Sequence, residues 1–160
     1  MLMIYKLKKT KVFAFYLILT SLFLMIFSTM ILGELSSEKL HDSESSLKVK
    51  AHDIISSQIE AFRKSDINTA YTFASPFIKS KFSNAEKFGK MVQTGYPMIW
   101  SPKNYKFLDF DVFNGALIQR VLFIDLQERI FVFDYEIRKY NANTWLINGV
   151  YPVKSSTSGA

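Results

Sequence analysis

Between Val12 and Leu32 the chain runs for 21 residues without a charged side chain. As an α-helix, a segment of this length spans about 31 Å, which matches the hydrocarbon core of a bilayer. Four lysines precede the segment, and the first acidic residue, Glu34, follows it. Because positively charged flanks tend to stay in the cytoplasm, the sequence predicts a single transmembrane helix that places the rest of the chain on the far side of the membrane.

The same segment could be retained as an anchor or cleaved as a signal peptide. The apolar region of a secretory signal peptide has about 7–15 residues and ends at small residues, whereas this run is longer and offers Ile31 and Gly33 at its best cleavage frame. We therefore predict that residues 1–33 are an uncleaved signal anchor. A cleaved signal peptide is the alternative.

The remaining chain is long enough for one domain. Residues 34–46 are polar and predict a tether, residues 47–154 predict a folded domain, and residues 155–160 predict a disordered tail. Beyond the four N-terminal lysines the chain has 16 basic and 14 acidic residues, which is too balanced for a phosphate-binding surface, so no nucleic-acid partner is expected. The absence of cysteine excludes disulfides, thiolate metal sites and cysteine nucleophiles.

Apolar side chains with helical spacing come first in this domain. Ile55, Ile59 and Phe62 share one face of a helix predicted between Leu47 and Lys64. Cap residues and breakers then predict further helical segments. These are a helix capped by Asp66, a short turn opened by Ser75-Pro76, and a helix that starts at a Ser83-Asn84-Ala85-Glu86 capping box and stops at Gly95.

After Lys103 the apolar period changes to two, which is typical of strands. Short polar turns between the strands predict an antiparallel meander. The predicted strands are Lys106 to Phe113, Leu117 to Leu126, Ile130 to Lys139 and Thr144 to Val153. The predicted fold class is α+β, with about three helices packed on a curved four-stranded antiparallel sheet, a cone-like arrangement that could hold an apolar cavity.

Several segments resemble one family. Residues 58–62 (QIEAF), 70–76 (AYTFASP), 95–97 (GYP) and 145–149 (WLING) resemble an uncharacterised bacterial family of exported or anchored proteins described as a domain of unknown function, over about residues 55 to 152. That family is similar in layout to the nuclear transport factor 2-like, or cystatin-like, superfamily. The resemblance implies a bacterial inner-membrane protein with a periplasmic domain, or a periplasmic or secreted protein after cleavage. The superfamily contains isomerases, dehydratases, ligand binders and assembly modules, so the fold alone selects no function.

Asp109 and Asp111 are the first candidates for chemistry. Their period-two spacing places both carboxylates on one strand face, alongside Phe107 and Phe113. If they were buried, mutual repulsion would raise one pKa and provide an acid and a base near neutral pH. The alternative is a solvated strand face.

Aromatic residues are the second group of candidates. Tyr71, Tyr96, Tyr135 and Trp145 are interpreted either as core or as pocket lining whose hydroxyls orient a ligand. The only histidines, His41 and His52, have no evident partner, so we expect both to be solvated and expect neither a metal site nor a cofactor.

The sequence thus favours a non-enzymatic binding or assembly domain at a membrane, with a protein partner, a second copy or a small apolar ligand. The alternative is a small cavity-type isomerase, dehydratase or hydrolase. It would use a carboxylate of the Asp109/Asp111 pair together with a tyrosine, Tyr135.

Overall fold

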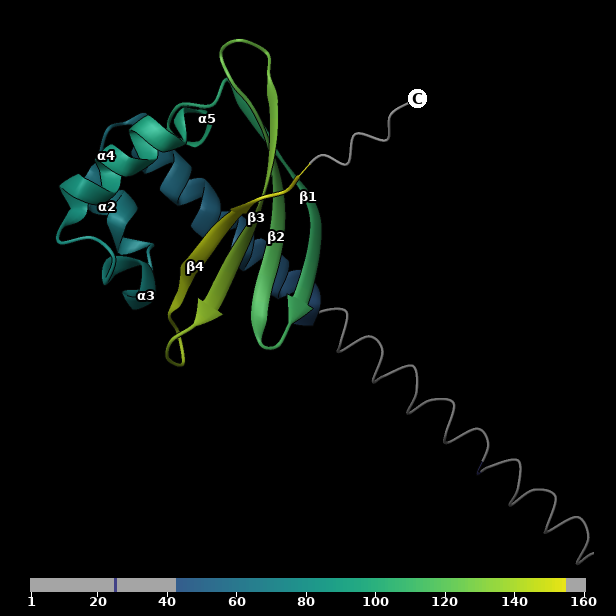
Figure 1. Cartoon of the computed structure of the whole chain (residues 1–160). Coiled ribbons are helices and arrows are strands. Elements are labelled where there is room, and N and C mark those ends of the chain that lie inside the picture. Colours follow the sequence, from purple (N-terminus) through teal and green to yellow (C-terminus); the bar gives the residue numbers. More distant parts are fainter. Residues whose placement is uncertain (1–24, 26–42, 155–160) are drawn as a thin grey trace, which may run out of the picture. The chain divides into compact units, whose positions relative to one another are not determined.

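The computed structural model describes Met25 and residues 43–154, and the chain divides into a unit that ends at Ser45 and a compact unit that begins at Ser46. The predicted anchor (residues 1–33, apart from Met25), most of the predicted tether and the predicted tail lie outside the described residues. Within the described part of the chain, no helix combines the length and the apolar character needed to cross a bilayer. The compact unit contains helices followed by a four-stranded sheet (Figure 1).

A long helix opens the compact unit. Residues 43–63 are helical, so the helix begins earlier than the predicted Leu47. Ala51, Ile55, Ile59 and Phe62 recur at intervals of three and four residues and are all buried, as expected for one face of an amphipathic helix. The helix ends in a tight turn in which the Asp66 amide donates to the Ala61 carbonyl at 2.8 Å.

Two short helices follow, and both begin at the caps that the sequence predicts. In α2 (Ile67–Thr72) the Asp66 carboxylate accepts from the Thr69 amide at 3.0 Å. In α3 (Pro76–Lys79) the Ser75 hydroxyl accepts from the Ile78 amide at 3.2 Å. The segment between them pairs with the edge of the sheet, because the Ser75 amide donates to the Ile147 carbonyl at 2.8 Å. This pairing ties the helices to the last strand.

The next helix, α4 (Ala85–Gly95), starts one residue away from the predicted cap. Asn84, not Ser83, is the N-cap, and its side-chain oxygen accepts from the Lys87 amide at 2.9 Å. The predicted capping box is therefore wrong, although the predicted stop at Gly95 is confirmed. The following segment contains the short helix α5 (Pro97–Trp100).

Gly89 allows α4 to lie close to α2. A Cβ at this position would be 2.7 Å from Cγ2 of Ile67, whereas carbon atoms in favourable contact are about 3.5–4.0 Å apart. The glycine thus removes the side chain that would otherwise separate the two helices.

The sheet is the predicted antiparallel meander. Its strands lie in the order β1 (Asn104–Phe113), β2 (Ala116–Ile124), β3 (Ile130–Lys139) and β4 (Trp145–Pro152). Asn114 and Gly115 connect β1 and β2 with φ values of 49° and 73°, the left-handed conformation that Asn and Gly tolerate best in a tight hairpin turn. The α+β class, with helices packed against a four-stranded antiparallel sheet, is confirmed.

One face of the sheet forms the core with the helices. On β3, Phe133, Tyr135 and Ile137 are buried, whereas the alternate residues Asp134 and Glu136 lie on the open face. The aromatic rings join the two layers, because Tyr96, just before α5, packs edge-on against Phe133 at 5.9 Å between ring centres. The predicted alternation on this strand is confirmed.

Candidate functional site

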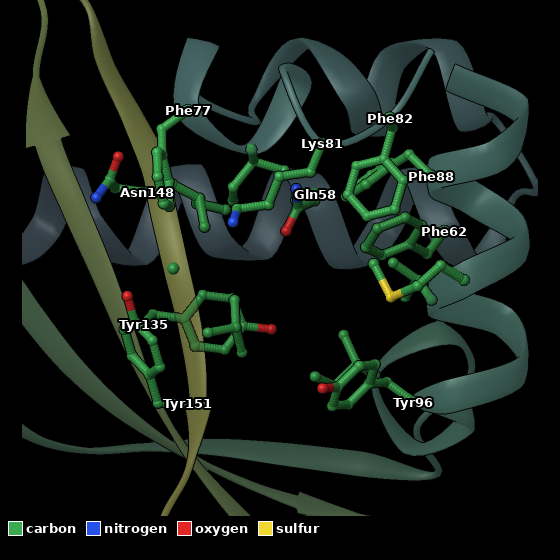
Figure 2. Close-up of a pocket in the computed structure, with 17 residues that line it drawn as sticks. Gln58, Phe62, Phe77, Lys81, Phe82, Phe88, Tyr96, Tyr135, Asn148 and Tyr151 are labelled. Atoms are coloured by element: carbon green, nitrogen blue, oxygen red, sulfur yellow. The ribbon is translucent and has the colours of Figure 1, made fainter. Parts of the chain in front are cut away.

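A cavity of about 390 Å³ lies between the helices and the inner face of the sheet (Figure 2). The long helix contributes Phe62, α4 contributes Phe88 and Val92, and the strands β3 and β4 contribute Tyr135 and Ile147. Most of the other lining side chains are also apolar or aromatic. The cavity therefore suits a small and largely apolar guest.

Tyr135 carries the most unusual polar group of this cavity. The side chain is fully buried, and its hydroxyl is the only buried side-chain polar atom in the described part of the chain that has no hydrogen-bond partner. Figure 2 shows the hydroxyl directed from β3 toward the cavity, where neighbouring atoms cover its oxygen. Burial raises the pKa of this hydroxyl far above its ordinary value, and Tyr105 adds to the shift, so the group remains protonated. It is a neutral hydrogen-bond donor without an acceptor.

A second polar group comes from the long helix. Gln58 is buried, and its amide nitrogen donates to the Ala70 carbonyl at 3.2 Å. That bond fixes the orientation of the amide, and Figure 2 shows its oxygen on the side of the cavity. The wall opposite the sheet thus carries one hydrogen-bond acceptor among aromatic side chains.

The rim of the cavity is formed by α3, the residues after it and β4. Phe77 is 53% exposed there, and the Lys81 ammonium group lies 4.5 Å from the centre of the Phe77 ring. Among the described side chains that line the cavity, Lys81 is the only charged one. The net charge of the lining is therefore positive.

On β4 the rim is held by a hydrogen-bond network around Asn148, which lies at a β-bulge. The Asn148 side-chain oxygen accepts from the Ser75 hydroxyl at 3.1 Å and the Tyr140 hydroxyl at 2.9 Å. Glu136 accepts from the Asn148 amide at 3.3 Å and from the Tyr151 hydroxyl at 3.1 Å. Tyr151 crosses over Gly149, and a Cβ at position 149 would overlap the Tyr151 ring unless that side chain moved.

The structure places Asp109 and Asp111 away from the cavity. A β-bulge between Phe107 and Phe110 turns Phe107 to the inner face, so the expectation that Phe107 shares a face with the aspartates is wrong. The Asp109 side chain is 83% exposed and lies 3.5 Å from Arg120 on the open face of the sheet. Asp111 is also exposed, and its carboxylate accepts from the Val112 amide. Among the described residues, no carboxylate lines the cavity.

The same bulge brings Phe107 against His52. We expected His52 to be solvated, and this expectation is wrong because the side chain is half-buried. Its ring stacks on Phe107 at 3.8 Å between ring centres, and Nε2 lies 3.1 Å from the Gln119 side-chain oxygen. The Gln119 amide nitrogen in turn donates to the carbonyl of Asp109 in the bulge at 3.1 Å. Burial lowers the pKa of His52 despite the bond to Gln119. Sequence reasoning missed this cluster because its members are far apart in the chain.

The remaining aromatic candidates divide between cavity and core. Tyr96 and Tyr135 both line the cavity. Tyr71 packs on Phe88 at 5.3 Å and donates its hydroxyl to the Lys79 carbonyl at 3.4 Å, and Trp145 packs against the core from β4. Within the region that the structure describes, no three His, Asp or Glu side chains are placed to hold a metal ion.

An antiparallel sheet that carries helices on one face and encloses an apolar cavity defines a small α+β domain with room for a ligand. The chain belongs to the family described as Domain of unknown function (DUF4864), whose model matches residues 44–160. Comparisons with curated proteins and with solved structures gave no match. The family match confirms the resemblance to a domain-of-unknown-function family, and it assigns no role to any residue.

Proposed function

We propose that this domain is a binding module that takes up one small, mostly apolar molecule in the cavity, with the Tyr135 hydroxyl as the polar anchor. The observation that carries the proposal is the unpartnered hydroxyl, which is fully buried and directed toward the cavity. A buried polar group without a partner costs about 1–3 kcal/mol of stability, and such costs concentrate at functional sites. A ligand that displaces the side chains covering the hydroxyl and accepts a hydrogen bond from it would remove this cost.

The size and lining of the cavity support the same function. Its volume of about 390 Å³ lies within the range of small-molecule sites, about 300–1,000 Å³, which are apolar with a few oriented polar groups. The alternative, an isomerase, dehydratase or hydrolase that combines a carboxylate with a tyrosine, lacks this support because neither Asp109 nor Asp111 lines the cavity. The order of helices and strands also favours a relation to the nuclear transport factor 2-like superfamily, which contains small-ligand binders.

Replacing Tyr135 with phenylalanine tests this function without knowledge of the ligand. In ligand-free protein, Tyr135→Phe should raise the free energy of unfolding by about 1–3 kcal/mol, because the substitution removes an unpaired buried hydroxyl and leaves the ring in place. Chemical denaturation of the full chain in detergent, after removal of bound small molecules, measures the difference. The matched control is Tyr71→Phe, which should lower stability by about 0.5–1.5 kcal/mol because that hydroxyl already donates to Lys79.

Retention of ligand is the second readout of the same variants. Native mass spectrometry of the full chain purified from its membrane should detect a bound small molecule on the wild type and on Tyr71→Phe, and much less on Tyr135→Phe. A Tyr135→Phe variant that is less stable than the wild type and carries the same small molecules would contradict the proposal.

The proposed location follows from the N-terminal segment. The uncharged stretch from Val12 to Leu32 and the lysines before it support a signal anchor in a bacterial inner membrane, with the binding domain in the periplasm. Protease added to spheroplasts should therefore digest the domain, while the chain should stay in the membrane pellet after alkaline carbonate extraction. Protection of the domain in intact spheroplasts would contradict this topology.

A further inference from the structure

The charge at the cavity rim restricts the chemistry of the ligand. This inference rests on the proposed binding function and asks which class of molecule the site accepts. Lys81 follows α3 and is the only charged residue that lines the cavity in the part of the chain that the structure describes. Figure 2 shows its side chain extending toward the cavity, near Phe77 and Gln58. Among the described residues, Lys81 forms no ion pair within 4.0 Å, whereas Arg120 and Arg129 each pair with an aspartate.

We propose that the ligand is an amphipathic organic anion whose acidic group binds Lys81 at the rim, while its apolar body lies in the cavity and a neutral acceptor reaches Tyr135. The binding site would thus have a charged outer end and a hydrogen-bonding inner end, separated by aromatic and aliphatic walls.

The two ends of the cavity favour different groups for a physical reason. An ionised group deep in an apolar cavity loses its hydration, which is costly unless a partner of opposite charge is present. Among the described residues, no basic group contributes to the pKa of the Tyr135 hydroxyl. At the rim, the exposed Lys81 supplies that partner and solvent still reaches the pair. The acidic group of a ligand therefore belongs at Lys81, and the acceptor at Tyr135 is a carbonyl or hydroxyl oxygen.

Cationic ligands are disfavoured by the same lining. They would meet the ammonium group of Lys81 and no carboxylate in the described lining. The simpler role of Lys81 is to cover the exposed Phe77 ring by a cation–π contact. If that were the only role of Lys81, the cavity would show no preference for anions. The experiment therefore compares the binding of an anionic and a neutral ligand.

A matched series of probes separates the two ends of the site. We would use methyl-ketone carboxylates of about six to ten carbons, such as 7-oxooctanoate, because their length suits a small cavity. The primary amide of each acid removes the charge, and the plain fatty acid of equal length removes the ketone. Binding to the full chain in detergent would be measured by isothermal titration calorimetry at low salt, with protein-free micelles as the blank.

The inference predicts that the wild type binds the keto acid about two- to fivefold more tightly than the amide, as expected for one exposed ion pair. Lys81→Met should abolish this preference by weakening the acid alone. The matched control, Lys79→Met, should keep the preference, because Lys79 lies over the Tyr71 ring and does not line the cavity. Tyr135→Phe should instead remove the advantage of the keto acid over the plain acid.

These outcomes distinguish failure of the inference from failure of the proposed function. The inference is overturned if acid and amide bind equally, or if the preference for the acid survives Lys81→Met. In either case, tighter binding of the keto acid than of the plain acid, lost in Tyr135→Phe, still supports a binding site. A wild type that binds the keto acid no more tightly than the plain acid, or a ketone effect that survives Tyr135→Phe, overturns the role of Tyr135 instead. The mass of the molecule retained on the purified full chain then distinguishes an acid derived from membrane lipid from a diffusible organic acid.

Discussion

Phe62→Ala should lower the free energy of unfolding by about 3–5 kcal/mol, the largest loss that we expect from a single substitution in this domain. Phe62 is buried and joins the long helix to the helices that follow, with ring centres 6.0 Å from Phe88 and 5.4 Å from Trp100. Alanine would remove the ring from both contacts and enlarge the existing cavity. Because small domains are stable by about 5–15 kcal/mol, the change removes a large part of the total.

Phe77→Ala is the matched control for this substitution. Phe77 also lines the cavity, but its side chain lies at the rim and is largely exposed. We expect a loss of about 0.5 kcal/mol or less, as for most surface substitutions. Urea denaturation followed by tryptophan fluorescence measures both variants. Similar losses for Phe62→Ala and Phe77→Ala would mean that the ring of Phe62 is not a central contact between the helices.

Gln119→Met should lower stability by about 1–3 kcal/mol although methionine has nearly the same length and shape. Gln119 is fully buried on β2, and its amide nitrogen donates to the carbonyls of Leu108 at 3.3 Å, Asp109 at 3.1 Å and Arg120 at 2.8 Å. Methionine would leave the bulge carbonyls and His52 without this partner while filling the same space. The loss therefore reports hydrogen bonding, not packing.

Two further measurements make this prediction specific. Gln127→Ala, in the exposed turn between β2 and β3, should change stability by less than about 0.5 kcal/mol. Amide hydrogen exchange of Gln119→Met should accelerate in β1 around Leu108 and Asp109, where the bulge loses its support, and much less in β4. Unchanged stability and unchanged exchange in β1 would show that the bulge does not depend on Gln119.

Local rules explain the parts of the fold that the sequence predicts well. The caps at Asp66 and Ser75 act over three residues, so residue type and spacing suffice to place them. The alternation on β3 places Tyr135 on the inner face, because the period of a strand needs no knowledge of its partners. A competing acceptor next to the predicted cap is enough to defeat such a rule, however, and Asn84 replaces Ser83 as the cap of α4.

The sequence predicted only some of the residues of the candidate site. Tyr135 and Tyr96 were among the aromatic candidates, but nothing local separates a tyrosine that lines a cavity from one that fills the core. Asp109 and Asp111 have the correct spacing for a shared face, yet the bulge decides which face the neighbouring Phe107 takes. Lys81 lies in no motif, and Gln58 belongs to the QIEAF segment, which assigns it no role. Only their position around the cavity gives these two residues a role.

The sequence by itself determined the α+β class, the order of helices and strands and the inward face of β3, since these depend on periodicity, turn residues and caps within a few positions. Only the tertiary structure decided the bulge in β1, the contact between His52 and Gln119, and the cavity with its unpaired hydroxyl. The physical reason is separation along the chain. His52 and Gln119 are 67 residues apart, and their hydrogen bond depends on the register of two strands and the packing of the long helix against them.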